Sequence, residues 1–343
     1  MSKDTISIVV LSYNQQNVIL DCLNSILFQK NFIKEIIISD DCSTDNTLNV
    51  INQWRQKNQS KLNVPVIILQ NKTNLGIVKN KLKAIKHCSG SIVKSIGGDD
   101  FLAPDACEKV LQFFTCNNSD IVVSKIFRFK SISDGIYQLL PQPSGTEIAA
   151  ATGFFTNDAE GQFRRLSIGN CIEAPGVFAK KELLLNLAKF SSHIKYIEDW
   201  PLWLLLTLSG IHIDYLDDYL AYYRIHDNQT SAFNQISNNI ISRNLLRDRI
   251  TIYEMFILPN LPMFSIVDKI SIIYSYKIYK ILYKQSSNKY IYKILKRYGL
   301  RVLHYLHYSN SLNDLFITKK INLYYKKKKP LLFRLSETGI INY

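Results

Sequence analysis

The first 125 residues alternate between short apolar runs and longer segments with helical periodicity. Apolar runs rich in β-branched residues, typical of strands buried on both faces, lie at 6–11, 35–39, 64–69, 91–96 and 120–123. Amphipathic helices are predicted at 18–28, 44–56, 77–88 and 104–116, where apolar residues recur three and four apart. Strands separated by such helices indicate βαβ units, so we expect an α/β fold with a mostly parallel, Rossmann-like sheet and flanking helices.

The pattern changes after this region. Residues 130–175 hold many Gly and Pro residues and little periodicity, which predicts a long irregular segment of functional importance. A strand near 176–180, a helix from 181, an apolar helix over 198–208 and strands at 211–216 and 219–225 follow. From residue 234 the pattern is helical. We therefore expect a domain over 1–232, with halves 1–125 and 126–232, and a helical extension over 233–343.

Charge is concentrated in the extension. The chain of 343 residues is 47% hydrophobic, as expected for a globular protein, and has a net charge of +14. Residues 261–343 contain 16 Lys and Arg, 3 Asp and Glu and 12 of the 20 Tyr, which accounts for +13 of that charge. Such asymmetry predicts an anionic partner for the extension, either a membrane or a nucleic acid.

Cysteine use and hydropathy bear on location. The six cysteines form no C-x-x-C pair, and several lie in apolar stretches, which favours buried free thiols and a reducing compartment. The apolar run at the N-terminus is too short for a signal peptide, and no uncharged apolar stretch reaches 18 residues. These features predict a cytoplasmic protein, or one attached to a membrane from the cytoplasmic side.

Three polar loops follow predicted parallel strands, at 12–14, 40–45 and 97–100. Ligands of such sheets bind at the carboxyl ends of the strands. Asp99 and Asp100 follow a Gly-Gly turn, and a strand-end aspartate pair is the minimal equipment for Mg²⁺, which usually takes one or two carboxylates plus substrate phosphates. The alternatives are an exposed acidic turn or a cap of the next helix. In the 40–45 loop, Ser43, Thr44 and Asp45 suit a helix cap, whereas Asp41 lies outside it.

Taken together, these motifs resemble a known family. The segments SIVVLSYNQQNVILDCLNSILFQ, EIIISDDCSTDNT, NLG and KSIGGDDFLAPD, in this order and spacing, are similar to the family 2 glycosyltransferases, over roughly residues 5–230. The resemblance implies the glycosyltransferase type-A fold, a nucleotide-binding half over 1–125 and an acceptor half over 126–232. It also implies transfer of a sugar from a nucleotide-sugar donor with a uracil base, with inversion, in surface-polysaccharide assembly.

The resemblance also implies roles for particular residues. Tyr13 would pack on the base, Asp41 would hydrogen-bond it, Asp99 would contact the ribose, and Asp100 would bind a Mn²⁺ or Mg²⁺ ion on the diphosphate. The remaining expected nucleotide contacts are Leu11, Asn14, Asn74 and Lys79. Lys79 also fits a solvated helix face.

A second acidic pair, Glu198 and Asp199, precedes Pro201 at the start of the apolar helix. The position suits a helix cap. The resemblance implies instead that Asp199 is the general base that deprotonates the acceptor hydroxyl. Near residue 225, His226 is either a metal ligand or a partly buried end of a strand, and Arg224 could face the diphosphate.

The extension interleaves Lys with Tyr and Ile. Tyr favours the membrane interface and Lys reaches anionic head groups, so we expect a peripheral attachment to the cytoplasmic face of the inner membrane beside a saccharide or lipid-linked acceptor. A solvated helix packed on its own domain is one alternative. A nucleic-acid binder is another, although residues 1–260 are nearly neutral and no nucleic-acid partner is expected. A nucleotidyltransferase would share the strand-end aspartates but would not need the Glu198–Asp199 pair.

Overall fold

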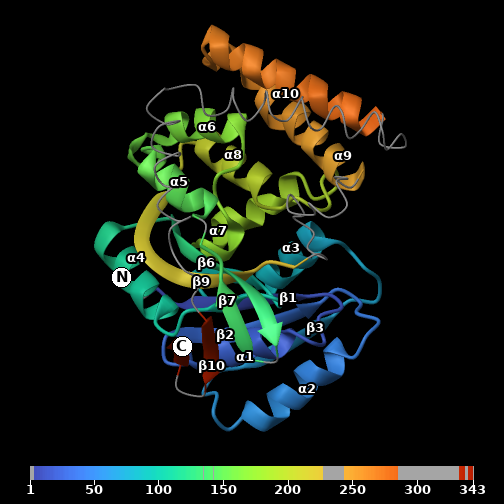
Figure 1. The fold of residues 1–343 in the computed structure, drawn as a ribbon, viewed down its shortest axis with the longest axis vertical. Coiled ribbons are helices and arrows are strands. Elements are labelled where there is room, and N and C mark those ends of the chain that lie inside the picture. Colours follow the sequence, from blue (N-terminus) through green and yellow to red (C-terminus); the bar gives the residue numbers. More distant parts are fainter. Residues whose placement is uncertain are drawn as a thin grey trace.

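The computed structural model describes residues 4–133, 135–141, 143–226 and 243–284 in full, and the backbone of 332–336 and 339–342. At its centre lie parallel strands in the order β3-β2-β1-β4 (Figure 1). These are β1 (Ile6–Ser12), β2 (Ile33–Asp40), β3 (Val66–Gln70) and β4 (Ile92–Gly97). Their carboxyl ends lie at one edge, as predicted for βαβ units.

The sheet continues beyond β4 with mixed pairing. Its further strands are β5 (Phe101–Leu102), β6 (Ile121–Ser133), β7 (Ile136–Leu139), β8 (Val177–Lys180), β9 (Asp214–Arg224), β10 (Leu332–Ser336) and β11 (Gly339–Asn342). β8 pairs antiparallel with β4 and β6, whereas β9 runs parallel to β6 and antiparallel to β5. The sheet is therefore parallel at its centre and mixed at its other edge. The predicted α/β class is confirmed.

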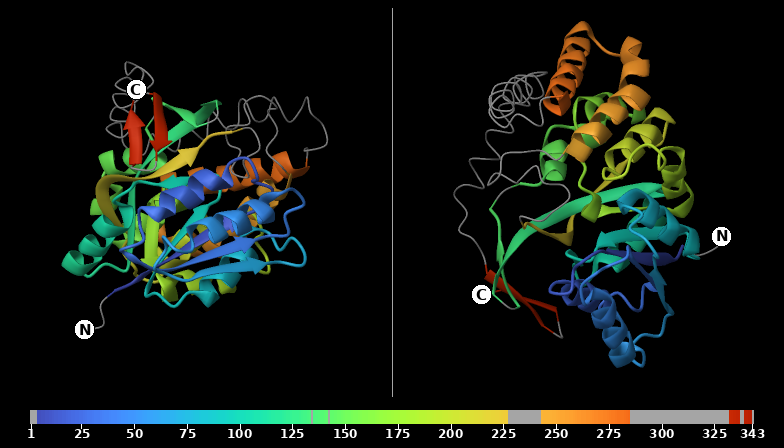
Figure 2. Two further views of the ribbon diagram at one scale, coloured as in Figure 1. Left: turned by 90° about the horizontal axis from the view of Figure 1, so that it is seen from below. Right: turned by 90° about the vertical axis from the view of Figure 1, so that its right-hand side faces the viewer.

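Helices cover both faces of the sheet (Figures 1 and 2). They are α1 (Ile19–Leu27), α2 (Thr47–Asn58), α3 (Ile77–His87), α4 (Ala106–Asn117), α5 (Gly145–Ala151), α6 (Ala159–Ile168), α7 (Lys181–Leu184), α8 (Trp200–Leu208), α9 (Arg243–Ile252) and α10 (Ile266–Lys284). Alternate residues of β1 show why both faces are apolar: Ile8 and Val10 join a core with α1, α2 and α4, while Val9 joins one with α3 and α8. Because both faces of the sheet are buried, polar side chains that could bind a ligand lie at the ends of the strands.

Several sequence-based expectations were wrong in detail. The segment 130–175 is not irregular, because it holds β7, α5 and α6. Both helices are short, and each is begun by a side-chain cap: Ser144 bonds to Glu147 N, and Asp158 to Gly161 N. The two strands expected over 211–225 form the single strand β9. Their register slips at two points against β6, which explains the apparent break.

The extension also differs from its prediction. Residues 243–284 are helical as expected, but β10 pairs with β7 and with β11, so an all-helical extension was wrong for 332–336 and 339–342. The predicted helices over 233–242 and 285–331 fall outside the described residues. Among the helices that the structure describes, none combines the length and hydropathy required to span a bilayer.

A buried lysine forms hydrogen bonds from a central strand to the second half of the domain. Lys94 on β4 is fully buried, and its ammonium donates to the carbonyls of Pro175 and Val177 and lies 4.5 Å from the ring centre of Phe178. Burial lowers its pKa from 10.5 to about 7. Between these two values the unfolded chain binds a proton that the folded chain does not.

The buried lysine predicts a pH-dependent stability. Because the unfolded state binds more protons, stability contributed at this site rises as pH increases from about 7 towards 10.5. We expect Lys94→Met to flatten the increase in melting temperature over this range, with the exposed Lys86→Met as the control. Scanning calorimetry at pH 7, 8, 9 and 10 measures it. Parallel curves for the wild type and Lys94→Met would contradict the assignment.

Candidate active site

Asp40 connects the carboxyl ends of β1 and β2 through hydrogen bonds. Its carboxylate is 1% exposed and accepts hydrogen bonds from Ser12 Oγ, Ser43 N and Ser43 Oγ. Asn14 adds a second connection between the two loops, because its Oδ1 accepts a hydrogen bond from Thr44 N at 2.8 Å. Asn14 adopts φ of 52°, a left-handed conformation that asparagine tolerates better than most residues. These contacts fix the two loops to each other.

These hydrogen bonds hold the loop that carries Tyr13, whose side chain lies at the edge formed by the carboxyl ends of the strands. It is 47% exposed, and it follows Ser12 at the carboxyl end of β1. Leu11 lies just before, half-buried, and its carbonyl accepts from Gly98 N at 2.9 Å. The loop that carries Tyr13 is thus connected by hydrogen bonds to the loop that carries the Asp99–Asp100 pair.

Asp41 holds the loop before α3. It is 4% exposed, and its Oδ1 accepts from Asn71 Nδ2 and Leu75 N, both at 2.8 Å, while Oδ2 accepts from Gly76 N at 2.9 Å. Asn74 Oδ1 also accepts from Gly76 N. The structure therefore brings Asp41 and Asn74 together at Gly76 N. Lys79, on the first turn of α3, is exposed.

Gly76 is constrained in two ways. Its φ is +80°, which disfavours any side chain, and a Cβ atom there would lie 2.6 Å from Cγ of Lys195. The Lys195 side chain therefore lies against the loop before α3. This contact joins the first half of the domain to the second at the candidate site.

The two adjacent aspartates after β4 have different surroundings. Asp99 has 20% of its side chain exposed, and its Oδ2 lies 3.0 Å from Nε2 of His226, whose side chain is 36% exposed. Asp100 is buried, and its Oδ1 accepts from the backbone N–H of Arg224 at 2.9 Å. Burial, and then the neighbouring Asp99 carboxylate, raise the pKa of Asp100 well above its usual value. Asp99 and His226 therefore form the accessible pair.

Arg224 does not face an open site, so the expectation that it contacts a diphosphate is corrected. It is 3% exposed, and its guanidinium donates to Asp21 Oδ2 at 2.5 Å, to the Asp99 carbonyl at 2.7 Å and to Ser131 Oγ. The guanidinium also stacks on Phe129. Arg224 thus anchors the loop of Asp99 to α1 and β6.

The second acidic pair begins α8. Asp199 Oδ1 accepts from Trp200 N at 2.7 Å, so the predicted cap is present, and Oδ2 accepts from Asn170 Nδ2 at 2.8 Å. Glu198 forms an ion pair with Lys81 of α3 at 3.6 Å. Burial, and then the Glu198 charge, raise the pKa of Asp199 to about 6. Asp199 is therefore ionised at neutral pH but titrates well above an ordinary aspartate.

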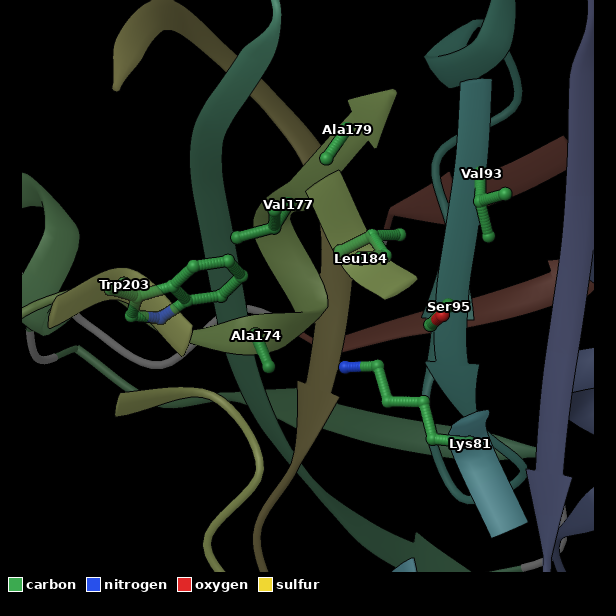
Figure 3. Close-up of a pocket in the computed structure, with 8 residues that line it drawn as sticks. All are labelled: Lys81, Val93, Ser95, Ala174, Val177, Ala179, Leu184 and Trp203. Atoms are coloured by element: carbon green, nitrogen blue, oxygen red, sulfur yellow. The ribbon is translucent and has the colours of Figure 1, made fainter. Parts of the chain in front are cut away.

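A small cavity lies beside the Lys81 end of this network (Figure 3). Its lining is formed by Lys81, Val93, Ser95, Ala174, Val177, Ala179, Leu184 and Trp203. Figure 3 shows the ammonium of Lys81 pointing toward Ala174 and Trp203. Ser95 Oγ and Trp203 Nε1 have no hydrogen-bond partner among the described residues. Three polar groups thus meet at the cavity next to Glu198.

Sequence reasoning missed the supporting residues Lys81, Asn170 and Asp21. A signal existed for Lys81, because it lies on the apolar face of α3 with Val78 and Leu82, where a solvated lysine is unexpected. Asn170 and Asp21 carry no local signal. Each meets its partner across a long chain separation, 29 residues for Asn170 and 203 for Asp21.

The residues fit a divalent cation held jointly with a substrate. Within the described part of the chain, no group of three or more His, Cys, Asp and Glu residues could hold a metal ion. Asp99 Oδ2 and His226 Nε2 offer two donor atoms at the accessible edge. Mg²⁺ commonly binds through one or two protein ligands and completes its shell with phosphate oxygens and water.

A parallel sheet centre with acidic loops at the strand ends is the arrangement expected of the glycosyltransferase type-A fold, and a solved structure shares the fold. The chain superposes on the structure of Staphylococcus aureus TarS residues 1–349 in complex with UDP-GlcNAc, with a TM-score of 0.54 and 18% identity, over 99% of this chain and 96% of that one. Residues 7–166 match the family model described as glycosyl transferase family 2. This match, together with the relatives below, identifies the chain as a glycosyltransferase, as the sequence motifs predicted.

Curated relatives point the same way. An uncharacterised glycosyltransferase of Haemophilus influenzae is 25% identical over 345 residues, which cover 96% of this chain and 98% of that protein. The abequosyltransferase RfbV of Salmonella typhimurium is 30% identical over 176 residues, or 51% of this chain and 50% of that protein. The glycosyltransferase class excludes the nucleotidyltransferase alternative.

The contacts of Arg224 predict a large effect on stability. Arg224→Ala removes a buried cation and leaves Asp21, 26% exposed, without it, so we expect a loss of about 2–4 kcal/mol in the free energy of unfolding. Arg164→Ala is the matched control, because its ion pair with Glu160 is about half exposed and should contribute less than about 1 kcal/mol. Urea unfolding measures both. Equal losses in the two variants would be inconsistent with an anchoring role for Arg224.

Proposed function

We propose that this glycosyltransferase uses a UDP-sugar donor, bound at the carboxyl ends of β1, β2 and β4 in the half over 1–125. The observation that carries the proposal is the hydrogen-bonded connection of three strand-end loops, which brings Tyr13, Asp41 and Asp99 to one edge. Tyr13 offers a ring for the base, and Asp41 holds the loop of Asn74 in place through its hydrogen bonds to Leu75 N and Gly76 N. The bound UDP-GlcNAc of TarS supports uracil as the base.

The metal ligands in this proposal are Asp99 and His226. Asp100 was the ligand expected from sequence, but its oxygen is bonded to the backbone of β9 and its side chain is buried. Asp99 is then available to the ion and to the ribose beside it. A bound Mn²⁺ or Mg²⁺ would neutralise charge on the departing diphosphate.

This assignment predicts different outcomes for the two aspartates. Asp99→Asn should reduce metal-dependent UDP affinity at least about tenfold, because it removes a charged ligand, and His226→Ala should act in the same direction. Asp100→Asn keeps an oxygen that can accept from Arg224 N and removes a charge that burial and Asp99 disfavour, so this variant should fold and retain its UDP affinity. Calorimetric titration of UDP with Mn²⁺, with Mg²⁺ and with EDTA measures these effects.

Two results would contradict the proposal. If UDP binds the wild type equally well with the metal and with EDTA, the metal site is wrong. If Asp100→Asn rather than Asp99→Asn abolishes the metal dependence, the two roles are reversed. Hydrolysis of a panel of UDP-, GDP- and dTDP-sugars then tests the base and identifies the sugar.

Asp199 is proposed as the general base. Its carboxylate takes the proton of the acceptor hydroxyl while the acceptor oxygen bonds to the anomeric carbon and the bond to the diphosphate breaks, a single displacement with inversion. Asn170 and Trp200 N hold its two oxygens. Burial, and then the charge of Glu198, which pairs with Lys81, raise the pKa of Asp199 and so keep its carboxylate basic.

Replacement of the base should affect turnover rather than donor binding. Asparagine also caps helices, so Asp199→Asn should fold, keep its UDP affinity within about twofold and lose about 10²–10⁴-fold in kcat. The wild-type rate should rise with pH through about 6, as Asp199 ionises. The exposed Asp217→Asn is the control. A near-normal kcat for Asp199→Asn would contradict the assignment of Asp199 as the general base.

The acceptor is proposed to be a saccharide or lipid-linked saccharide, recognised by the half over 126–232, in the assembly of a surface polysaccharide. Its supports are the relatives whose names specify sugar transfer, including the abequosyltransferase. For such an acceptor, the basic extension over 233–343 would attach the enzyme to the cytoplasmic face of the membrane. Oligomeric state does not enter this proposal.

A further inference from the structure

We propose that the outer face of α10 is the surface through which this enzyme docks on an anionic lipid bilayer. The inference deepens the proposed membrane attachment and rests on it. It names one helix face, here called the α10 face: Ile266, Ile270, Ile273, Lys277, Lys280, Ile281 and Lys284. At 100° per residue these seven side chains fall within an arc of roughly 100°.

The α10 face is aliphatic and exposed. Ile266 is 77% exposed and Ile270 60%, while Ile273 and Ile281 are 38% and 42% exposed. Val267, at the edge of the arc, is 58% exposed. Isolated exposed apolar residues are ordinary, but four isoleucines on one stripe of one helix form a patch of the kind that marks an interaction surface.

The charges of the α10 face have one sign. Lys277, Lys280 and Lys284 are all exposed, and no acidic residue of α10 falls within the arc. Of the acidic residues nearby, Asp268 bonds to Ser265, and Glu254 accepts from Tyr276 OH, to which Lys280 Nζ also donates at 3.2 Å. Aliphatic side chains with lysines at their border match a bilayer surface, where apolar groups enter the acyl boundary and ammonium groups meet lipid phosphates.

The opposite face fixes α10 to the rest of the enzyme. Ile272, Ile278 and Leu282 are buried, and Tyr279 packs on Tyr253. The Arg249 guanidinium lies 5.5 Å from the ring centre of Tyr279. α10 is therefore a firmly attached helix, about 28 Å long, at the end of the molecule opposite α2 (Figure 1). Docking through it would hold the candidate site in a set orientation to the membrane.

The test uses the full chain and co-sedimentation with vesicles. The probes are vesicles of phosphatidylglycerol with phosphatidylethanolamine, and vesicles of phosphatidylcholine alone. The wild type should sediment with the anionic vesicles in 0.1 M salt and be released in 0.5 M salt. Two variants address the face: Ile266→Ser with Ile270→Ser, and Lys277→Gln with Lys280→Gln and Lys284→Gln. Each should weaken binding more than about tenfold.

Matched controls remove the same groups elsewhere. Lys57→Gln with Lys61→Gln and Lys86→Gln removes three exposed charges, and Ile132→Ser with Ile136→Ser removes two exposed isoleucines. Both should bind as the wild type does. Ile270→Trp gives a direct readout, because the native Trp residues are buried: its emission should shift to the blue and be quenched by brominated lipids.

Every contrary outcome overturns the proposal. These are no vesicle binding by the wild type, wild-type binding by both α10 variants, equal loss in the matched controls, or loss only when 285–343 is deleted. Concentration-dependent dimerisation abolished by Ile266→Ser would instead assign the face to a second copy. Hydrolysis of UDP-sugars in solution by the same variants keeps this test separate from that of the proposed activity.

Discussion

The hydrogen bonds of the Arg224 guanidinium hold the candidate active edge together. This cation is buried among Phe129, Tyr137 and three hydrogen-bond acceptors, so its desolvation is offset only if every partner stays in place. Its backbone N–H binds Asp100 while its side chain binds the carbonyl of Asp99. β9 and the loop after β4 are therefore locked in one register. The position of His226 opposite Asp99 follows from this.

Two buried lysines repeat the same principle elsewhere. Lys94 extends from β4 to the carbonyls of 175 and 177, and Lys81 extends from α3 to Glu198. Each carries a side-chain amino group from the first half of the domain into contact with the second. Apolar packing fills the space between the halves but is not directional, whereas a buried ammonium requires particular acceptors. These groups therefore fix the backbone at 175 and 177, and the Glu198 side chain, relative to β4 and α3.

Local patterns predicted what local physics determines. Buried β-branched runs marked the central strands, and the strand-end rule was sufficient to select the loops of Tyr13, Asp41 and Asp99. The sequence could not show that Asp100 is buried and Asp99 accessible, because the burial of Asp100 depends on a hydrogen bond to β9, 124 residues later in the chain. The role of Arg224 was missed for the same reason. The helices in 130–175 are short and contain glycine, and β10 pairs with a strand nearly 200 residues away.

The contact between Gly76 and Lys195 also bears on how this sequence can diverge. Two constraints disfavour any residue other than glycine at position 76: its left-handed backbone conformation and the Lys195 side chain next to it. A shorter residue at 195 would relieve only the second constraint. Residue 76 is thus expected to remain glycine over evolutionary time even where residue 195 becomes shorter. In hybrids that splice the first half of one family member to the second half of another, the side chain at 195 would have to fit against this glycine loop.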